Sequence, residues 1–229
     1  MLLLLTGIDL FANHHMKSPL RTGMVNPPHG FHRVVKLPEQ YWVFDFTKDV
    51  DVSWQCPFEY QIGRYDEIRP GMYNHQIFSG ERDLHVGIDI GAPQQTEVFA
   101  FADGTIHCFG INTEEGSYGP TIITQHRVAL ATKVGSQQMN PLTTIWVLHG
   151  HLASESLEGL EVGQAICGGQ LLARIGNKSE NGGWVPHLHI QISLVEPTTY
   201  DLEGVVARGN RQQALQQFPD PRLILGEIY

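Results

Sequence analysis

Two histidines separated by one residue are the first candidates for chemistry in this sequence. His187 and His189 lie near the start of the alternating, β-branched run over 185–192. On a β-strand, residues two apart project from one face, so both imidazoles would share a side with Gln191 while Leu188 faces the other side. On its own, such a pair is as consistent with two solvated surface histidines as with a functional site.

An acidic side chain and a third histidine lie in the segment 82–93. In a straight strand, His85 and Asp89 would share a face but stand about 13 Å apart, at roughly 3.3 Å per residue, which is too far to bind one ion. The two side chains can meet at an ion only if the chain bends between them. Gly87 supplies the conformational freedom for that bend.

Together these side chains supply the donor set of a catalytic zinc site. The available donors are His85, Asp89, His189 and the neighbouring His151 and His187. Two imidazoles and one carboxylate make a three-ligand set that leaves the fourth tetrahedral position open for water. The ion would lower the pKa of that water towards about 7 and polarise a scissile carbonyl. The two histidines that do not bind the ion could take the water's proton and hydrogen-bond the developing oxyanion. Spacing alone leaves open which histidine does what.

The elements that must position these residues are mostly strands. The 229 residues include 24 glycines and 13 prolines, set among short runs rich in Val, Ile, Phe and Thr, and 41% of the chain is hydrophobic. This composition predicts a β-rich fold with many turns. We expect strands over 34–37, 41–46, 54–60, 121–126, 143–152 and 187–192, a hairpin of 97–102 with 104–109, a long loop over 61–80 and a helix over 205–218.

Other polar side chains are expected to lie away from the site. Tyr65, Arg69 and Tyr73 belong to the long loop and are interpreted as loop decoration, with entry into the cleft as the alternative. His149 and His151 stand two apart at the end of a predicted strand, so they should face the same way. His149 is nevertheless expected to be a surface or core histidine without a catalytic role.

Charge and cysteine usage narrow the function classes. A net charge of −9 argues against nucleic acid or an anionic membrane as the main partner. Cys56, Cys108 and Cys167 are widely separated and lack a CxxC spacing, which predicts buried free thiols and no cysteine zinc site. The start of the chain makes a poor signal peptide, and no segment is long enough to span a bilayer, so the cytoplasm is favoured.

Taken in order, the motifs make the chain similar to the LytM/lysostaphin-like zinc metallopeptidases. That family has an H-x-x-x-D motif, a histidine in a G-H-L element and an H-x-H motif, which resemble 85–89, 150–152 and 187–189 here. The similarity extends over about 82–193. The loop over 180–184 looks more like a subgroup found fused to kinase-like and aminotransferase-like domains.

The resemblance implies a site and a substrate class. It implies one zinc per chain held by His85, Asp89 and His189, with His151 and His187 as the catalytic pair. It also implies a mainly β fold with an antiparallel β-sheet core, as a sandwich or half-barrel, and a short C-terminal helix. The usual substrates of the family are peptide bonds of bacterial cell-wall crosslinks, which would make the cell envelope the alternative compartment.

The resemblance covers only the middle of the chain. We expect an N-terminal arm and β-rich extension packed on the core over 1–80, the metallopeptidase core over 81–195, and a C-terminal extension with a helix over 196–229. A non-catalytic zinc-binding regulator with the same fold, bound to a partner protein, is the alternative function. A lipoyl- or biotinyl-type carrier is a weaker third, because no lysine stands at a suitable hairpin tip.

Overall fold

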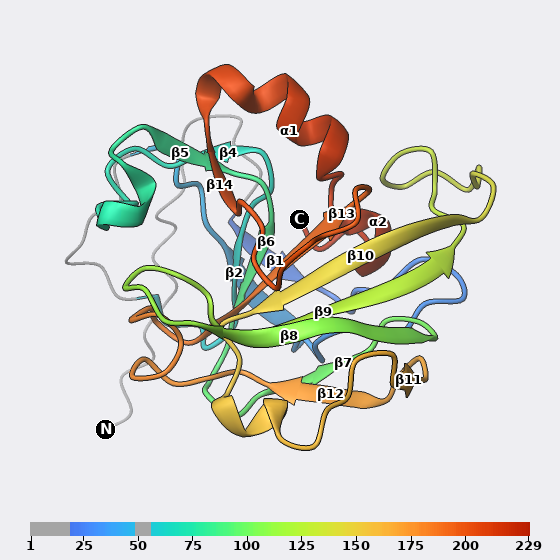
Figure 1. Ribbon diagram of the computed structural model, residues 1–229. Coiled ribbons are helices and arrows are strands. Elements are labelled where there is room, and N and C mark those ends of the chain that lie inside the picture. The colour runs from blue at the N-terminus through green and yellow to red at the C-terminus, as the bar shows by residue number, and fades with distance from the viewer. Residues whose placement is uncertain (1–18, 49–55) are drawn as a thin grey trace, which may run out of the picture.

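The computed structural model describes residues 19–48 and 56–229, and a large sheet runs through the middle of the molecule (Figure 1). In spatial order its strands are β1 (Leu20–Thr22), β2 (Gln40–Val43), β3 (Gln61–Gly63), β6 (Ile88–Gly91), β13 (His187–Ser193), β10 (Thr143–Gly150), β9 (Gly119–Val128), β8 (Gly104–Asn112) and β11 (Ala165–Ile166). Neighbouring strands are antiparallel except for β2 and β3, which are parallel. The mainly β fold with an antiparallel core is confirmed.

Smaller elements lie on both sides of the large sheet. A three-stranded sheet has the order β14 (Val205–Ala207), β5 (Arg82–His85), β4 (Glu67–Ile68), and a two-stranded sheet pairs β12 (Leu171–Arg174) with β7 (Glu97–Phe99). The helices are α1 (Arg211–Gln217) and α2 (Arg222–Leu225), with 3₁₀ turns at Gln76–Phe78, Ser154–Leu157 and Arg208–Asn210. In Figure 1 the three-stranded sheet and α1 lie above the large sheet, and the two-stranded sheet lies below it.

The two faces of the large sheet differ because side chains alternate along each strand. Ile88 and Ile90 of β6 and Leu188 and Ile190 of β13 point to one face, where they belong to the main apolar core. Burying each of these side chains stabilises the fold by about 1.5–3 kcal/mol. The opposite face of the same two strands is left for polar side chains, and the site is built there.

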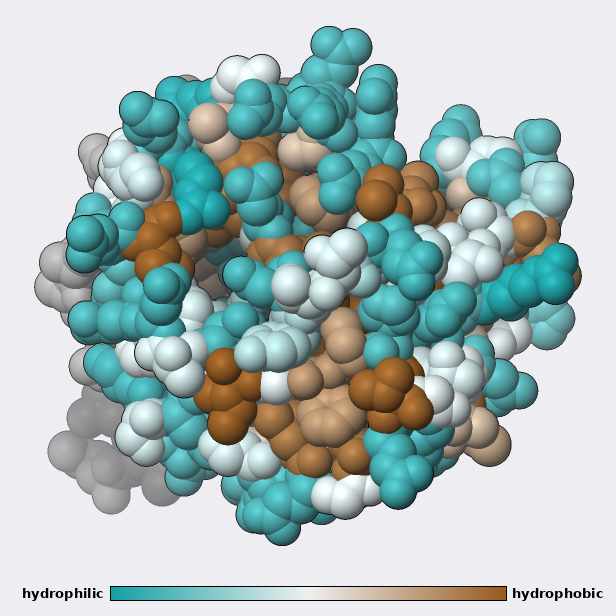
Figure 2. Space-filling view, in the orientation of Figure 1, coloured by the Kyte–Doolittle hydropathy of each residue, from teal (hydrophilic) through white to brown (hydrophobic). Residues whose placement is uncertain are grey.

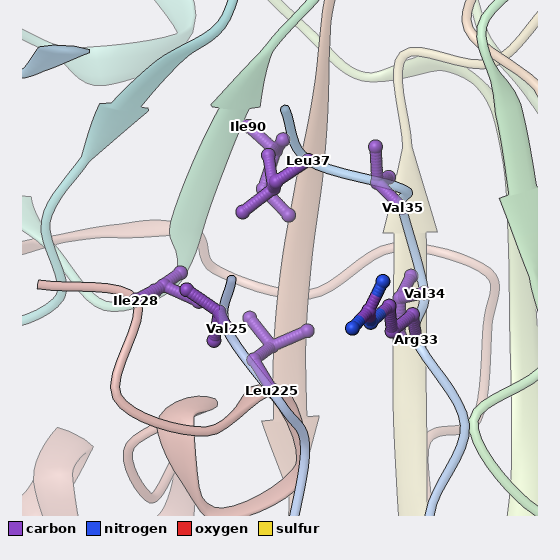
Figure 3. Close-up of a pocket in the computed structure, with 8 residues that line it drawn as sticks. All are labelled: Val25, Arg33, Val34, Val35, Leu37, Ile90, Leu225 and Ile228. Carbon is purple, nitrogen blue, oxygen red and sulfur yellow. The ribbon is translucent and has the colours of Figure 1, made fainter. Parts of the chain in front are cut away.

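An irregular segment before β2 covers the apolar face. Val34 and Val35 are buried in the core, yet they form no strand, so the strand predicted over 34–37 is wrong. The carbonyl oxygen of Val34 accepts a single hydrogen bond from the Phe99 backbone N–H. Figure 3 shows both valines and Ile90 around a cavity of about 20 Å³. Such a volume holds one water at most, so no substrate binds there.

Three other predicted elements are corrected. The predicted hairpin of 97–102 with 104–109 is wrong, because β7 pairs with β12 and β8 pairs with β9. The expected turn residue Asp103 instead accepts a hydrogen bond from the backbone N–H of Gly168. The loop over 61–80 contains β3 and β4. The helix over 205–218 begins only at α1, because its first valines pair with β5 as strand β14.

The remaining strand predictions are met to different extents. The strands expected over 121–126, 143–152 and 187–192 are confirmed as β9, β10 and β13, and the strand over 41–46 is confirmed only as far as Val43. Residues 56–60 form no strand, and the rest of the strand expected over 54–60 lies outside the described residues.

The surface carries a mixture of polar and apolar side chains. Figure 2 shows a mainly hydrophilic face, with apolar side chains gathered over β8 and β12. All three cysteines are free, but Cys167 is exposed and Cys56 and Cys108 are half-buried, so the prediction of buried thiols is wrong. Within 19–48 and 56–229, no helix combines the length and apolar character needed to cross a bilayer. The signal-peptide prediction concerns residues outside those ranges.

Candidate metal centre

The polar face of the large sheet holds two candidate ligands side by side. β6 and β13 are antiparallel neighbours, and their register puts Asp89 opposite His189 and Gly91 opposite His187. Directly opposed residues on neighbouring strands point to the same face, so the Asp89 carboxylate and the His189 ring meet there. Both faces of β13 are buried over most of its length, which excludes two solvated histidines on an open sheet surface.

His85 reaches the same point from another sheet. β5 ends at His85 and β6 begins at Ile88, and the two strands belong to different sheets, so the chain bends between them as expected. Gly87 lies at the bend, where it provides space: a Cβ there would stand 2.5 Å from His189 Nε2. The two ligand-bearing segments can approach each other only because this residue has no side chain.

Three ligand atoms form a tight triangle. Nε2 of His85 lies 3.2 Å from Oδ1 of Asp89, Nδ1 of His189 lies 3.0 Å from the same oxygen, and the two nitrogens are 3.2 Å apart. Around a tetrahedral zinc ion with bonds of about 2.0–2.1 Å, ligand atoms stand about 3.3 Å apart. The spacing of the three atoms therefore suits one small ion.

The hydrogen bonds of His85 determine which of its nitrogens faces the triangle as an acceptor. Its Nδ1 lies 2.9 Å from the carbonyl oxygen of Arg64. A carbonyl oxygen can only accept, so the proton of the neutral ring is assigned to Nδ1. The Nε2 lone pair therefore points at Asp89 and His189.

In His189 the two ring nitrogens exchange roles, so that Nδ1 is the nitrogen that faces the triangle. Its Nε2 lies 3.1 Å from Oε1 of Gln191 and 3.4 Å from the hydroxyl of Tyr118. Gln191 donates its amide N–H to the carbonyl oxygen of Glu203, which turns the amide oxygen towards the ring. The ring proton is therefore assigned to Nε2, and three lone pairs converge without a proton between them. A bound cation satisfies all three, so these residues fit a metal ion.

Local charges keep these groups in the forms that bind metal. Burial lowers the pKa of His85 to about 4, and the positive charge of Arg69 adds to the shift. Burial would raise the pKa of Asp89, but His85 and Arg69 outweigh it and hold that pKa well below its usual range. Near pH 7 the centre therefore offers a neutral imidazole and an ionised carboxylate.

Two further histidines lie beside the triangle. His187 Nε2 is 3.8 Å from Asp89 Oδ1, and its Nδ1 is 2.7 Å from the carbonyl oxygen of Val185. His151 Nδ1 is 2.8 Å from the carbonyl oxygen of Asn181, and the rings of His151 and His187 have centroids 4.2 Å apart. Each ring therefore carries its proton on Nδ1 and keeps the Nε2 lone pair free. Burial lowers the pKa of both histidines.

The end of β10 separates His151 from His149. The strand ends at Gly150, and His151 has a φ of 63°, in the left-handed region, so its side chain leaves the strand alternation and joins His187. His149 is 1% exposed, and within the described chain neither of its ring nitrogens has a hydrogen-bond partner. The prediction that the two histidines face one way is wrong, and of the two positions expected for His149, surface or core, the structure shows the core.

Sequence reasoning missed the residues behind the ligands. Arg69, interpreted as loop decoration, is buried and donates a 2.6 Å hydrogen bond from Nη1 to Oδ2 of Asp89. Gln191 accepts from His189. The available signals were a Glu67–Arg69 pair two residues apart in a segment treated as loop, and a glutamine two residues after a histidine on one strand face.

An aromatic wall stands beside the histidine pair. The indole N–H of Trp184 donates to the carbonyl oxygen of Gly116 at 3.1 Å, which fixes the ring. The centroid of that ring lies 5.3 Å from His75, 6.2 Å from Tyr73 and 6.5 Å from His151. The long loop before β13 therefore places a large aromatic surface next to the candidate centre.

The whole constellation lies inside one family match. The family model described as Peptidase family M23 matches residues 83–201, slightly more than half of the chain. This chain belongs to peptidase family M23. The resemblance drawn from the motifs is thereby confirmed at the level of the family. Zinc is the ion of M23 peptidases, and His85, Asp89 and His189 form the candidate site for it.

Curated M23 relatives match the same part of the chain. The DD-carboxypeptidase/endopeptidase Mpg of Neisseria meningitidis serogroup B is 31% identical over 111 residues, which is 48% of this chain and 20% of the relative. The Neisseria gonorrhoeae protein of the same name gives the same values. The match thus spans about a fifth of the length of these relatives.

Solved M23 structures are more distant. The catalytic domain of the prophage-encoded M23 protein EnpA from Enterococcus faecalis is 20% identical, with a TM-score of 0.41, and the match covers 67% of this chain and 91% of that one. The catalytic domain of lysostaphin from Staphylococcus simulans is 18% identical, with a TM-score of 0.38 and coverages of 68% and 92%. Likeness at this level carries no argument about the site.

Proposed function

We propose that this chain is a zinc-dependent endopeptidase that hydrolyses amide bonds in peptidoglycan crosslink peptides. The observation that carries the proposal is the triangle of three unprotonated ligand atoms from His85, Asp89 and His189, with two more histidines beside it. The substrate class is supported by the carboxypeptidase and endopeptidase named in the Neisseria relatives. Because those proteins are matched over about a fifth of their length, their activity is extended to this chain only as part of the proposal.

The proposed roles follow from the free lone pairs. When bound, zinc acidifies a water molecule and polarises a scissile carbonyl. His151 or His187 accepts the water's proton at Nε2, because Nδ1 of each ring is engaged with a carbonyl oxygen, and later gives it to the leaving amine. The negative charge that develops on the scissile oxygen favours the protonated form of the other ring, which would then donate a hydrogen bond from Nε2 to that oxygen.

Metal content is the first test. Purified chain should hold about one zinc, and His189→Ala should lose it, because two ligands of the triangle remain and the third is gone. His107→Gln is a matched control, since His107 is bonded to the Pro197 carbonyl oxygen and takes no part in the triangle. A metal-free chain with full activity, or equal zinc loss in both variants, would contradict the proposal.

Turnover is the second test. Crosslinked wall peptides and polyglycine should be cleaved, with products identified by mass spectrometry, and His151→Ala and His187→Ala should keep zinc while losing turnover by about 100-fold or more. Loss of zinc in either variant would move that residue into the ligand set. A zinc-loaded chain that cleaves no peptide while a partner protein co-purifies would favour the non-catalytic regulator instead.

The finer family placement is also a proposal. The Glu180 carboxylate accepts from the backbone N–H groups of Ser154 and Asn177, so the loop over 180–184 has a defined shape next to the site. The basis for proposing a placement near the subgroup fused to kinase-like and aminotransferase-like domains is the sequence of this loop and of residues 219–221, and not the geometry of the loop. The compartment, cytoplasm or cell envelope, stays a prediction.

A further inference from the structure

A buried ion pair stands directly behind the candidate metal centre. Glu67 lies on β4, opposite His85 of β5, and Arg69 follows two residues later on the same edge. The side chains of Glu67 and Arg69 are each 2% exposed, and Nε of Arg69 donates to Oε2 of Glu67 at 3.0 Å. Charged side chains are rarely buried this fully unless they are paired, so the position of Arg69 is set by the fold.

The guanidinium of Arg69 is bonded on every side. Nη1 donates to Oδ2 of Asp89 at 2.6 Å and to the hydroxyl of Tyr73 at 2.9 Å, and Nη2 donates to the carbonyl oxygen of Arg64 at 3.2 Å. The same Arg64 carbonyl oxygen accepts from Nδ1 of His85. Arg69 is therefore joined to the supports of two candidate ligands at once, through a rigid planar group.

Glycine makes room for this arrangement. A Cβ at position 63 would lie 2.6 Å from Nη2 of Arg69 and 3.1 Å from Oδ2 of Asp89. Gly63 is paired with Asp89 across β3 and β6, so any side chain there would point at the guanidinium. The backbone and the ion pair thus fit together around one oxygen of the carboxylate.

The two oxygens of Asp89 consequently have different tasks. Oδ1 belongs to the triangle with His85 and His189, whereas Oδ2 accepts the short, charge-assisted bond from Arg69. To bind an ion through both oxygens, the carboxylate would have to give up that bond. We propose that Arg69 is a positioning residue that makes Asp89 a one-oxygen ligand, and that Glu67 holds Arg69 in place.

The consequence is an open coordination position. With a one-oxygen carboxylate the ion would have three protein ligands and one open position, so that a water would complete four-coordination, whereas a second carboxylate oxygen would crowd that position and raise the coordination number to five. The inference rests on the proposed zinc centre and deepens it. It does not depend on which peptide bond is cleaved, so it can be tested on the purified chain without a substrate.

Cobalt substitution is the direct test. Four-coordinate Co²⁺ absorbs visible light far more strongly than five- or six-coordinate Co²⁺, so the spectrum reports how many oxygens bind. The Co²⁺-loaded chain should show the intense spectrum, and Arg69→Met should weaken it as Asp89 turns to bind with both oxygens. The zinc dissociation constant, from chelator competition, should rise by about 10–100-fold.

Matched variants separate positioning from folding. Arg222→Met removes another arginine–aspartate pair, Arg222 with Asp220, and should change neither spectrum nor zinc affinity. Arg69→Met removes the nearest cation from the buried Glu67 carboxylate, which keeps, among the described residues, only the Phe46 N–H and a 3.9 Å contact with Arg64. The double variant Glu67→Gln with Arg69→Met therefore provides a neutral pair and should show the same spectral loss. Arg69→Lys, which cannot make the forked contacts, should fall between Arg69→Met and the native chain.

The outcomes are decisive in both directions. A folded Arg69→Met or double variant with the native cobalt spectrum and a zinc dissociation constant within about threefold of the native value would overturn the proposal. A native chain that binds neither ion would overturn it together with the proposed function. If the native chain binds zinc and its cobalt spectrum is more intense than that of Arg69→Met, but the native chain cleaves no wall peptide, the role of Arg69 is supported and only the peptidase proposal is contradicted.

Discussion

Adding one methyl group at the crossing of β5 and β6 should remove the metal without touching a ligand. In Gly87→Ala, the new Cβ would lie 2.5 Å from Nε2 of His189 and 3.0 Å from the carbonyl oxygen of Ile190. Ordinary contacts between such atoms need about 3.5 Å, so the ring must move by about 1 Å. Metal–ligand distances tolerate only about 0.2 Å, so His189 can no longer bind the ion with the other two ligands.

The size of the effect can be stated as a melting-temperature shift. Zinc at about 1,000 times its dissociation constant stabilises the native chain by about 4 kcal/mol, and at about 10 times by about 1.4 kcal/mol. For a chain of this length about 2–4 °C corresponds to 1 kcal/mol. If Gly87→Ala weakens zinc binding by about 100-fold, the zinc-induced shift should fall from about 8–16 °C to about 3–6 °C.

The assay compares each variant with and without zinc, so the cost of overpacking in the metal-free protein, about 1–3 kcal/mol, cancels. Gly209→Ala is the control, because a Cβ at that position would meet nothing within 4 Å. It should keep the full zinc-induced shift. A Gly87→Ala protein that gains as much from zinc as the native chain would refute the close approach of His189 to the bend.

Two further predictions concern the core and the support of one ligand. Burial lowers the pKa of His149 to about 3. Because the unfolded chain takes up this proton near pH 6.5, stability should fall below that pH by about 1.4 kcal/mol per pH unit. His149→Phe should reduce the difference between urea midpoints at about pH 7 and about pH 5, and an unchanged difference would contradict a neutral buried ring. Gln191→Leu removes the acceptor for His189 Nε2–H and should raise the zinc dissociation constant about 10–100-fold in chelator competition, whereas an unchanged value would show that Tyr118 alone holds the ring.

The ligand positions were predictable because their signals are local. The alternation along 187–192 places His189 on one strand face, and the distance argument for His85 and Asp89 requires a bend that the structure contains. Both inferences need only residues within a few positions of each other, whereas the grouping of His189 with His85 and Asp89 was implied by the family resemblance. The catalytic roles of His151 and His187 stay predictions that the experiments above address.

The support of the ligands was not predictable because it depends on pairing between distant segments. Glu67 and Arg69 look like ordinary loop charges until β4 is known to pair with β5, next to His85. The left-handed backbone of His151 carries no sequence signal either, since such a conformation is uncommon for a residue with a side chain. Val34 and Val35 show the same limit, because β-branched residues suit any buried position and only a neighbouring strand makes them a strand.

The positions of the candidate ligands depend on the strands that pair with β5 and β6. β6, which carries Asp89, is flanked by β3 from the region before residue 81, and β5, which carries His85, is flanked by β14 from the region after residue 201. The backbone N–H of Val86 at the bend donates to the carbonyl oxygen of Gly204, which lies beyond the family match over 83–201. Since a strand with an unpaired edge is held less firmly, the spacing of the three ligand atoms depends on both flanking regions. The division of the chain into three regions stays a prediction, yet the arrangement of the candidate ligand atoms already depends on strands from all three regions.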